Sequence, residues 1–276
     1  MENLPRVVEL GRDTPEVCRL GLATRGNTHL TSDDVHCAVA AGVNYLNWCG
    51  HVDGMSRAVR EFSPADRRQV VVAKQFFART AVEAREELSS TLDVLKTDYI
   101  DCLSFYYVES PQEWSAITGP DGALEELVRA RDSGAVRLIG ITTHQRHLVA
   151  EWIQSGHLDF AMVRYNAAHR GAEEDVFPVA EQCGVPIVAF TCQRWGALIQ
   201  PTLQDPAGYS PLPAREWYRF VLAQPTVSVA LMAPKNGAEL EEDLALLEDW
   251  QLPTPEVMEE LRAHGLRVRG SAGGFP

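Results

Sequence analysis

Polar side chains that can transfer protons stand at the ends of several apolar runs. Asn47 and His51 follow the run VNYL, Lys74 closes the run VVVA, and Tyr106 follows IDCLSF. Burying the ammonium of a lysine at the end of an apolar run costs free energy unless the ammonium has a partner or a chemical role. A neighbouring ammonium also favours the phenolate form of a tyrosine. Tyr106 assisted by Lys74 is therefore a candidate general acid, with His51 as a second acid and Asn47 orienting the lysine. The alternative for Lys74 is a buried stem whose ammonium reaches the rim.

These runs belong to a regular alternation of short apolar segments and amphipathic segments. The apolar segments have the continuous hydrophobic character of buried parallel strands, and the segments between them have the 3.6-residue period of helices. Eight such units predict a single (β/α)8 TIM barrel, and RVVELGRDTPEV at 6–17 predicts an N-terminal β-hairpin ahead of it. Because the sequence shows no linker, residues 1–276 are expected to form one domain. The expected strands are 16–23, 43–48, 69–76, 98–107, 136–143, 159–166, 186–191 and 227–232.

The composition excludes several classes of protein. A net charge of −13 argues against binding to nucleic acid or to an anionic membrane, because both need basic surface. No apolar run reaches the 18 residues of a membrane span, and the start of the sequence lacks the apolar stretch of a signal peptide. The scattered cysteines show no metal-ligand spacing and indicate reduced thiols. We therefore expect a cytoplasmic protein without a metal, a monomer or weak homo-oligomer that acts on a small molecule.

In a barrel of this class the active site lies at the C-terminal ends of the strands. That rule selects a further set of candidates after the fifth to eighth strands. Arg164 among them would favour an anionic substrate or a cofactor pyrophosphate if it points into the mouth, whereas a salt bridge on the rim is the alternative. The set comprises Thr142, Thr143, Arg164, Asn166, Phe190, Lys235 and Asn236.

The sequence resembles the aldo-keto reductase superfamily over nearly its whole length. The likeness rests on AAGVNYLN, VVVAKQF, TLDVLKTDYIDCLSF, GAVRLIGITTH, VRYN and LMAPKNGAELEEDL, which fall in the family's order. The resemblance implies NADPH-dependent reduction of a carbonyl by a tetrad of Asp, Tyr, Lys and His. Here Asn47 stands for the Asp, Val52 for the Tyr and Tyr106 for the His, while Lys74 matches the Lys. The tetrad is thus expected to be degraded.

The resemblance also implies the cofactor contacts. Phe190 matches the aromatic that stacks on nicotinamide, and Thr142, Thr143 and Asn166 loosely match the polar residues around it. Lys235 matches the basic residue on the 2′-phosphate, and the helix N-terminus at 236–238, beginning at Asn236, is an anion site. Glu239 nearby repels a phosphate, so a preference for NADP over NAD is expected to be weak.

Three interpretations remain open from the sequence. The first is an NADPH-dependent reductase of a small carbonyl compound in which Tyr106 is the relocated acid, so that activity falls at alkaline pH. The second is a barrel adapted to non-redox chemistry, as a lyase, isomerase or cyclase. The third is a pseudoenzyme that binds a ligand without nicotinamide. Function follows the site and not the fold, so the arrangement of these residues decides among them.

Overall fold

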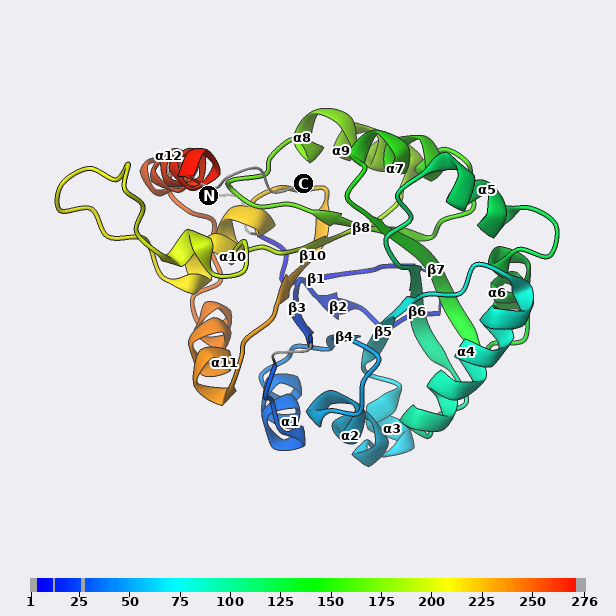
Figure 1. Ribbon diagram of the computed structural model, residues 1–276. Coiled ribbons are helices and arrows are strands. Elements are labelled where there is room, and N and C mark those ends of the chain that lie inside the picture. Colours follow the sequence, from blue (N-terminus) through cyan, green and yellow to red (C-terminus); the bar gives the residue numbers. More distant parts are fainter. Residues whose placement is uncertain (1–3, 12, 26–27, 272–276) are drawn as a thin grey trace.

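The computed structural model describes residues 4–11, 13–25 and 28–271. Within them, eight parallel strands close into a barrel in the order β10-β3-β4-β5-β6-β7-β8-β9, with helices around the outside (Figure 1). The predicted (β/α)8 barrel is confirmed. The barrel strands are β3 (Leu20–Ala23), β4 (Tyr45–Trp48), β5 (Val71–Phe76), β6 (Ile100–Phe105), β7 (Val136–Thr143), β8 (Phe160–Arg164), β9 (Ile187–Phe190) and β10 (Val227–Met232).

The helices begin where short polar side chains cap them. Thr31, Asp53 and Thr80 each accept a hydrogen bond from a backbone N–H in the first turn of the helix that follows, which satisfies a donor that the helix itself leaves open. The helices are α1 (Ser32–Ala40), α2 (Gly54–Glu61), α3 (Pro64–Arg67), α4 (Ala81–Leu95), α5 (Pro111–Thr118), α6 (Ala123–Asp132), α7 (Arg146–Ile153), α8 (Ala172–Asp175), α9 (Phe177–Cys183), η1 (Ala197–Ile199), α10 (Ala214–Leu222), α11 (Gly237–Leu244), η2 (Ala245–Leu247) and α12 (Pro255–Ser271).

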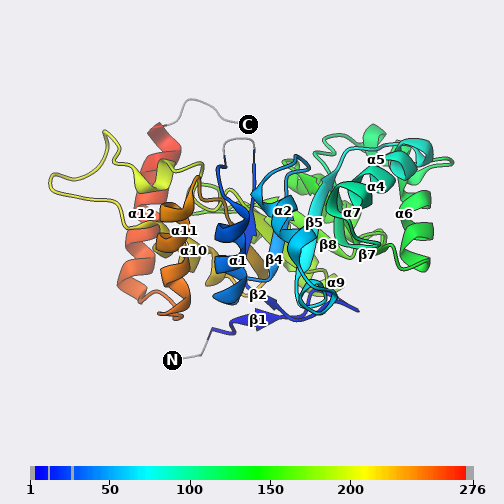
Figure 2. The same cartoon turned by 90° about the horizontal axis from the view of Figure 1, so that it is seen from below.

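The predicted N-terminal hairpin is also present. Strand β1 (Val7–Val8) pairs antiparallel with β2 (Val17–Cys18), and Figure 2 shows both strands lying across one end of the barrel. Leu10 and Val17 pack with the side chains of the barrel interior. The hairpin therefore closes the end at which β3 begins. Arg12, part of the expected turn, lies outside the described residues.

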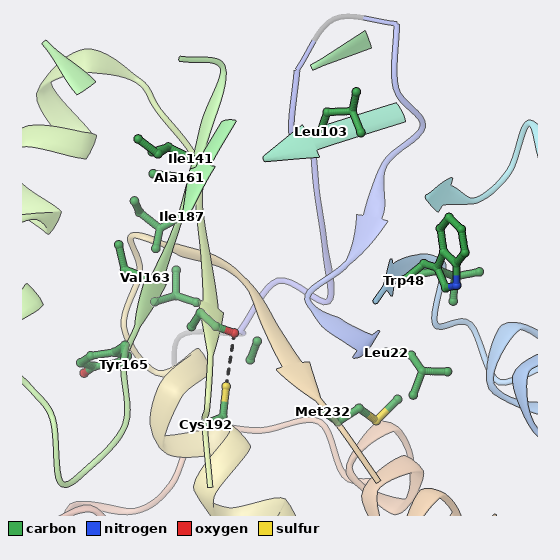
Figure 3. Packing of buried hydrophobic residues seen from close by; sticks show 14 of the residues in the cluster. Leu22, Trp48, Leu103, Ile141, Ala161, Val163, Tyr165, Ile187, Cys192 and Met232 are labelled. Atoms are coloured by element: carbon green, nitrogen blue, oxygen red, sulfur yellow. Dashed lines mark hydrogen bonds between the residues drawn. The ribbon is translucent and has the colours of Figure 1, made fainter. Parts of the chain in front are cut away.

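The strands are buried on both faces. One face packs inside the barrel, as Tyr45, Ala73 and Met162 do. The other face packs under the helices, where Leu103 and Ile141 lie in the outer cluster drawn in Figure 3. Successive residues of a strand point to opposite faces, so the parity of a position decides whether its side chain reaches the barrel mouth. Over residues 4–11, 13–25 and 28–271, no helix combines the length and the apolar character needed to cross a membrane.

Candidate functional site

A pocket of about 340 Å³ opens among the C-terminal ends of the barrel strands, where the fold places its active sites. Each of the eight barrel strands, or the loop after it, contributes to the lining of this pocket. The polar and aromatic residues of the lining include Arg25, Asn47, His51, Gln75, Tyr106, Tyr107, Thr142, Phe190, Gln193 and Tyr218. Across the described residues, His, Cys, Asp and Glu side chains form no group of three that could hold a metal ion.

Asn47 reaches the pocket from β4 and is 3% exposed. Its Oδ1 is buried and has no hydrogen-bond partner among the described residues. A buried amide oxygen without a donor is costly. This position is thus suited to a ligand that brings an N–H or an O–H.

Lys74 does not face the pocket. The prediction that Asn47, Lys74 and Tyr106 meet at the barrel mouth is therefore wrong for Lys74. The side chain of Lys74 points toward the helices, where its ammonium is paired with Glu87 of α4 and donates to the carbonyl of Gln75 at 2.9 Å. The other oxygen of Glu87 accepts from the backbone N–H groups of Phe77 and Ala78, both at 2.9 Å. The ion pair of Lys74 and Glu87 therefore holds the loop after β5 against α4.

Gln75 is the residue of β5 that faces the mouth. It has the same parity as Ala73, which packs inside the barrel. A shift of one residue along a strand moves the side chain to the other face. The lysine is therefore one position away from the place that the resemblance assigned to it, and a neutral amide occupies that place.

Tyr106 lines the pocket at the end of β6. Its ring stacks on Tyr107 with the centroids 3.9 Å apart, and it lies against Phe77 at 4.8 Å. Arg79 Nη2 donates to the Tyr106 carbonyl oxygen at 2.6 Å, which holds the turn. Burial raises the pKa of Tyr107, and a hydrogen bond with Tyr106 raises it further. Two phenols therefore meet at this edge of the pocket, and Tyr107 keeps its proton at neutral pH.

In the loop after β4, one polar residue caps a helix and another lines the pocket. Asp53 caps α2, since its Oδ1 accepts from Ser56 N at 2.8 Å. His51 lines the pocket with an exposed side chain, while its carbonyl accepts from Trp48 Nε1 at 2.6 Å. Val52, the match to the family's tyrosine, is 68% exposed. Of these residues only His51 keeps a candidate chemical role.

The polar candidates at the ends of β7 and β8 also divide into one that faces the pocket and two that form hydrogen bonds with the backbone. Thr142 faces the pocket, and its Oγ1 donates to Ser104 Oγ at 3.2 Å. Thr143 has the opposite parity, and its Oγ1 accepts from Gln145 N at 2.9 Å. Asn166 is fully buried, donates to Thr191 O and accepts from Ala168 N, both at 2.9 Å. The side chains of Thr143 and Asn166 thus form hydrogen bonds with backbone groups. This corrects the expectation that they lie at the cofactor.

Phe190 ends β9 at the pocket, as expected, and lies edge-on to His144 with the ring centroids 6.1 Å apart. Sequence reasoning missed Arg25, which lines the pocket from the loop after β3. Its Nε is buried and unpaired within residues 4–11, 13–25 and 28–271. Its place directly after β3 was the available signal, because the loops after all eight strands meet at the mouth.

The start of α11 carries an ion pair. Lys235 is exposed, and its Nζ lies 3.5 Å from Glu239 Oε1, whose other oxygen accepts from Lys235 N at 2.8 Å. The side chain of Asn236 caps the helix by accepting from Glu239 N at 3.0 Å. The side chain of Asn236 thus caps the helix, and the charge of Lys235 is balanced by its neighbour. The anion site expected from the backbone N–H groups at 236–238 stays a prediction.

A buried carboxyl stands behind the pocket wall. Asp243 of α11 is 3% exposed and accepts from Tyr218 OH at 3.2 Å, and Gln193 gives it a second hydrogen bond. Burial raises the pKa of Asp243 to about 7, although both hydrogen bonds oppose the shift. Tyr218 and Gln193 both line the pocket. The protonation of Asp243 is thus linked to this part of the wall.

Comparison with known proteins agrees with the barrel fold. A model of the aldo/keto reductase family matches residues 20–216. A protein of Escherichia coli (strain K12) named NADH-specific methylglyoxal reductase is 26% identical over 133 residues, which are 48% of this chain and 40% of that protein. The solved structures of aldo-keto reductase AKR11C1 from Bacillus halodurans, in holo and apo forms, superpose with a TM-score of 0.72 at 18% identity, covering 97% of both chains. At that identity the superposition shows the fold alone.

Proposed function

The chain belongs to the aldo/keto reductase family, and from this premise we propose that it reduces a small carbonyl compound with a nicotinamide cofactor at the barrel mouth. Tyr106 carries the proposal, because its phenol lines the pocket at the end of β6. A phenol within hydrogen-bond reach of a carbonyl oxygen can protonate the alkoxide that forms on reduction. The name of the E. coli relative describes a reaction of the same class.

Three side chains of the pocket fit the parts of a nicotinamide dinucleotide. Phe190 offers a partly buried ring for the nicotinamide. Asn47 Oδ1 requires a donor and suits an amide or a ribose hydroxyl. Arg25 Nε requires an acceptor and suits a pyrophosphate oxygen. When bound, the cofactor supplies a hydride.

Tyr107 assists the proton transfer in place of the family's lysine. Because its pKa is raised by burial and by its hydrogen bond with Tyr106, it keeps its proton at neutral pH. A neutral phenol can donate a hydrogen bond to Tyr106 as that residue gives up its own proton, which stabilises the phenolate left behind. Lys74 takes no part, since Glu87 holds its ammonium on the helix side of β5.

The proposal is tested by cofactor binding and by turnover. We expect NADH or NADPH to bind the purified protein with micromolar affinity in a calorimetric titration, and methylglyoxal or another small aldehyde to be reduced. Phe190→Ala should weaken cofactor binding about tenfold through the loss of stacking area. Absence of binding at millimolar concentrations of both cofactors would refute the proposal.

Cofactor preference should respond to the pair at the start of α11. Lys235 alone would favour the 2′-phosphate of NADPH, but Glu239 offsets its charge. Glu239→Gln keeps an oxygen that can accept from Lys235 N and removes the negative charge. We expect the ratio of NADPH to NADH affinity to rise about three- to tenfold, and Lys235→Ala should lower it while NADH affinity stays nearly constant.

Glu241→Gln is the matched control for that experiment, because it removes the same charge from an exposed position on the same helix. It should leave the ratio close to that of the wild type. If Glu239→Gln also leaves the ratio unchanged, the 2′-phosphate does not lie near Lys235, and the NADP assignment has to be abandoned.

A second candidate function is ligand binding or non-redox chemistry without nicotinamide. It is favoured by the residues that replace the family's tetrad: Val52 is exposed, Gln75 is neutral, and the ammonium of Lys74 is engaged elsewhere. Under this alternative the protein would bind small molecules in the pocket with neither cofactor present and would not oxidise NADH or NADPH with any aldehyde.

A further inference from the structure

A groove lies on the outside of the barrel, at the end opposite the mouth. Its walls come from α2 and α3, from the end of α4 with the loop that follows, and from the start of β7. Tyr99 directly precedes β6 and Arg137 is the second residue of β7, so the groove lies where these strands begin. Its volume is about 760 Å³, compared with about 340 Å³ for the pocket at the mouth. The groove is therefore separate from the proposed active site.

The lining of the groove is rich in positive charge, although the chain carries a net charge of −13. Five cationic side chains stand against two carboxylates in the lining, Asp93 and Asp98, and against the buried carboxylate of Asp101, which leaves an excess of two positive charges. A concave surface of one sign raises the local concentration of ions of the opposite sign. The cations are Arg60, Arg67, Arg68, Lys96 and Arg137.

Two of these cations are fixed in place. Arg67 and Arg137 lie against the ring of Tyr99, with their guanidinium carbons 4.2 and 4.4 Å from its centroid. Both pair with the carboxylate of Asp101, at 2.8 and 2.6 Å. Arg67 is 6% exposed, and its Nε has no hydrogen-bond partner within residues 4–11, 13–25 and 28–271. A buried guanidinium N–H without an acceptor is costly, and an anion bound against this wall supplies one.

Two other cations of the lining are open to a ligand. The side chains of Arg68 and Lys96 are exposed and form no ion pair or hydrogen bond with any residue that the structure describes. Lys96 ends α4 in the left-handed conformation, with φ of 52°. Glycine is the residue that this conformation favours, so the lysine side chain stands at the groove at a cost in backbone strain.

We propose that this groove binds a small molecule that carries more than one phosphate group. Arg68 and Lys96 pair with its phosphate oxygens, and the wall of Arg67 and Arg137 supplies fixed positive potential. A guanidinium presents paired donors that match a phosphate, and an ammonium supplies a compact positive charge. Cations from three segments spread over a groove of this size match a diphosphate better than a single phosphate ion. The site is independent of the reductase chemistry proposed for the mouth.

The test is calorimetric titration of the full-length protein with inorganic pyrophosphate and with orthophosphate, in a phosphate-free buffer of low ionic strength. We expect pyrophosphate to bind about tenfold or more tighter than orthophosphate. Its affinity should fall as sodium chloride is added, because salt screens exposed charges. Equal affinity for the two anions, or no binding of pyrophosphate at millimolar concentration, would overturn the inference.

Substitutions place the binding in the groove. Arg68→Gln combined with Lys96→Gln should lower pyrophosphate affinity about tenfold or more. Arg129→Gln combined with Arg215→Gln is the matched control, since it removes two exposed arginines that lie outside the groove, and it should keep the affinity of the wild type. Arg67 and Arg137 stay unchanged in every variant, because they compensate the buried charge of Asp101.

A gain in affinity is expected from Asp93→Asn combined with Asp98→Asn, because these changes remove two negative charges from the lining. Pyrophosphate affinity should rise about three- to tenfold. Arg25→Gln alters the mouth instead and should leave pyrophosphate affinity unchanged. ADP titrated into Arg25→Gln then shows whether a nucleoside on the diphosphate adds affinity. Affinity that responds to Arg25→Gln but to neither pair of changes in the groove would place the anion at the mouth and contradict the proposal.

Discussion

Replacing Tyr106 by phenylalanine should lower kcat for carbonyl reduction by about 10²–10⁴-fold. The change removes one hydroxyl from a ring that stacks on Tyr107 and packs at a tilt against Phe77, so the shape of the pocket is retained. Cofactor affinity should therefore change little, and the loss should appear in kcat in single-turnover measurements.

Two further Tyr→Phe substitutions serve as comparisons for the loss in kcat. Tyr45→Phe removes a hydroxyl that is buried inside the barrel and makes no hydrogen bond to any part of the chain that the structure describes, so the rate should stay near that of the wild type. Tyr107→Phe removes the hydrogen bond with Tyr106 and should lower kcat about tenfold. If Tyr106→Phe turns over normally and His51→Ala does not, His51 is the donor.

Replacing Asp243 by asparagine should raise the free energy of unfolding at pH 8 by about 2–4 kcal/mol. Burial, together with the charges of Glu239 and Glu242, raises the pKa of the folded carboxyl to about 7 from the ordinary aspartate value of 3.8. Between these values the folded state holds a proton that the unfolded state has lost. Stability therefore falls as the pH rises through this window, and above pH 7 the buried carboxylate carries its full cost.

Denaturant unfolding at pH 5 and pH 8 checks this prediction, because the gain from Asp243→Asn should shrink as the pH is lowered. Asp205→Asn is a control of opposite sign. Burial opposes ionisation of Asp205, but hydrogen bonds from Thr202 N, Arg267 and His264 outweigh it and lower the pKa to about 2. Asp205→Asn should therefore destabilise the protein at neutral pH. An equal gain from Asp243→Asn at both pH values would show that its carboxyl is not neutral in the folded state at pH 5.

The sequence by itself determined the barrel and the end of it that holds the site. Apolar segments of strand length alternate with amphipathic ones eight times, which leaves a parallel barrel as the arrangement that buries them. The N-terminal hairpin could be predicted for similar reasons of local chemistry. Asn47, His51, Tyr106, Thr142 and Phe190 all line the pocket, because the strand ends alone are sufficient to bring them together.

The tertiary structure decided which side chains face that pocket. The run VVVAKQF is buried on both faces, so its hydrophobicity does not alternate and cannot show whether Lys74 or Gln75 points inward. Asp53 and Asn236 follow strands as catalytic residues do, but the same residue types also cap helices, and only the placement of the N–H groups separates the two uses.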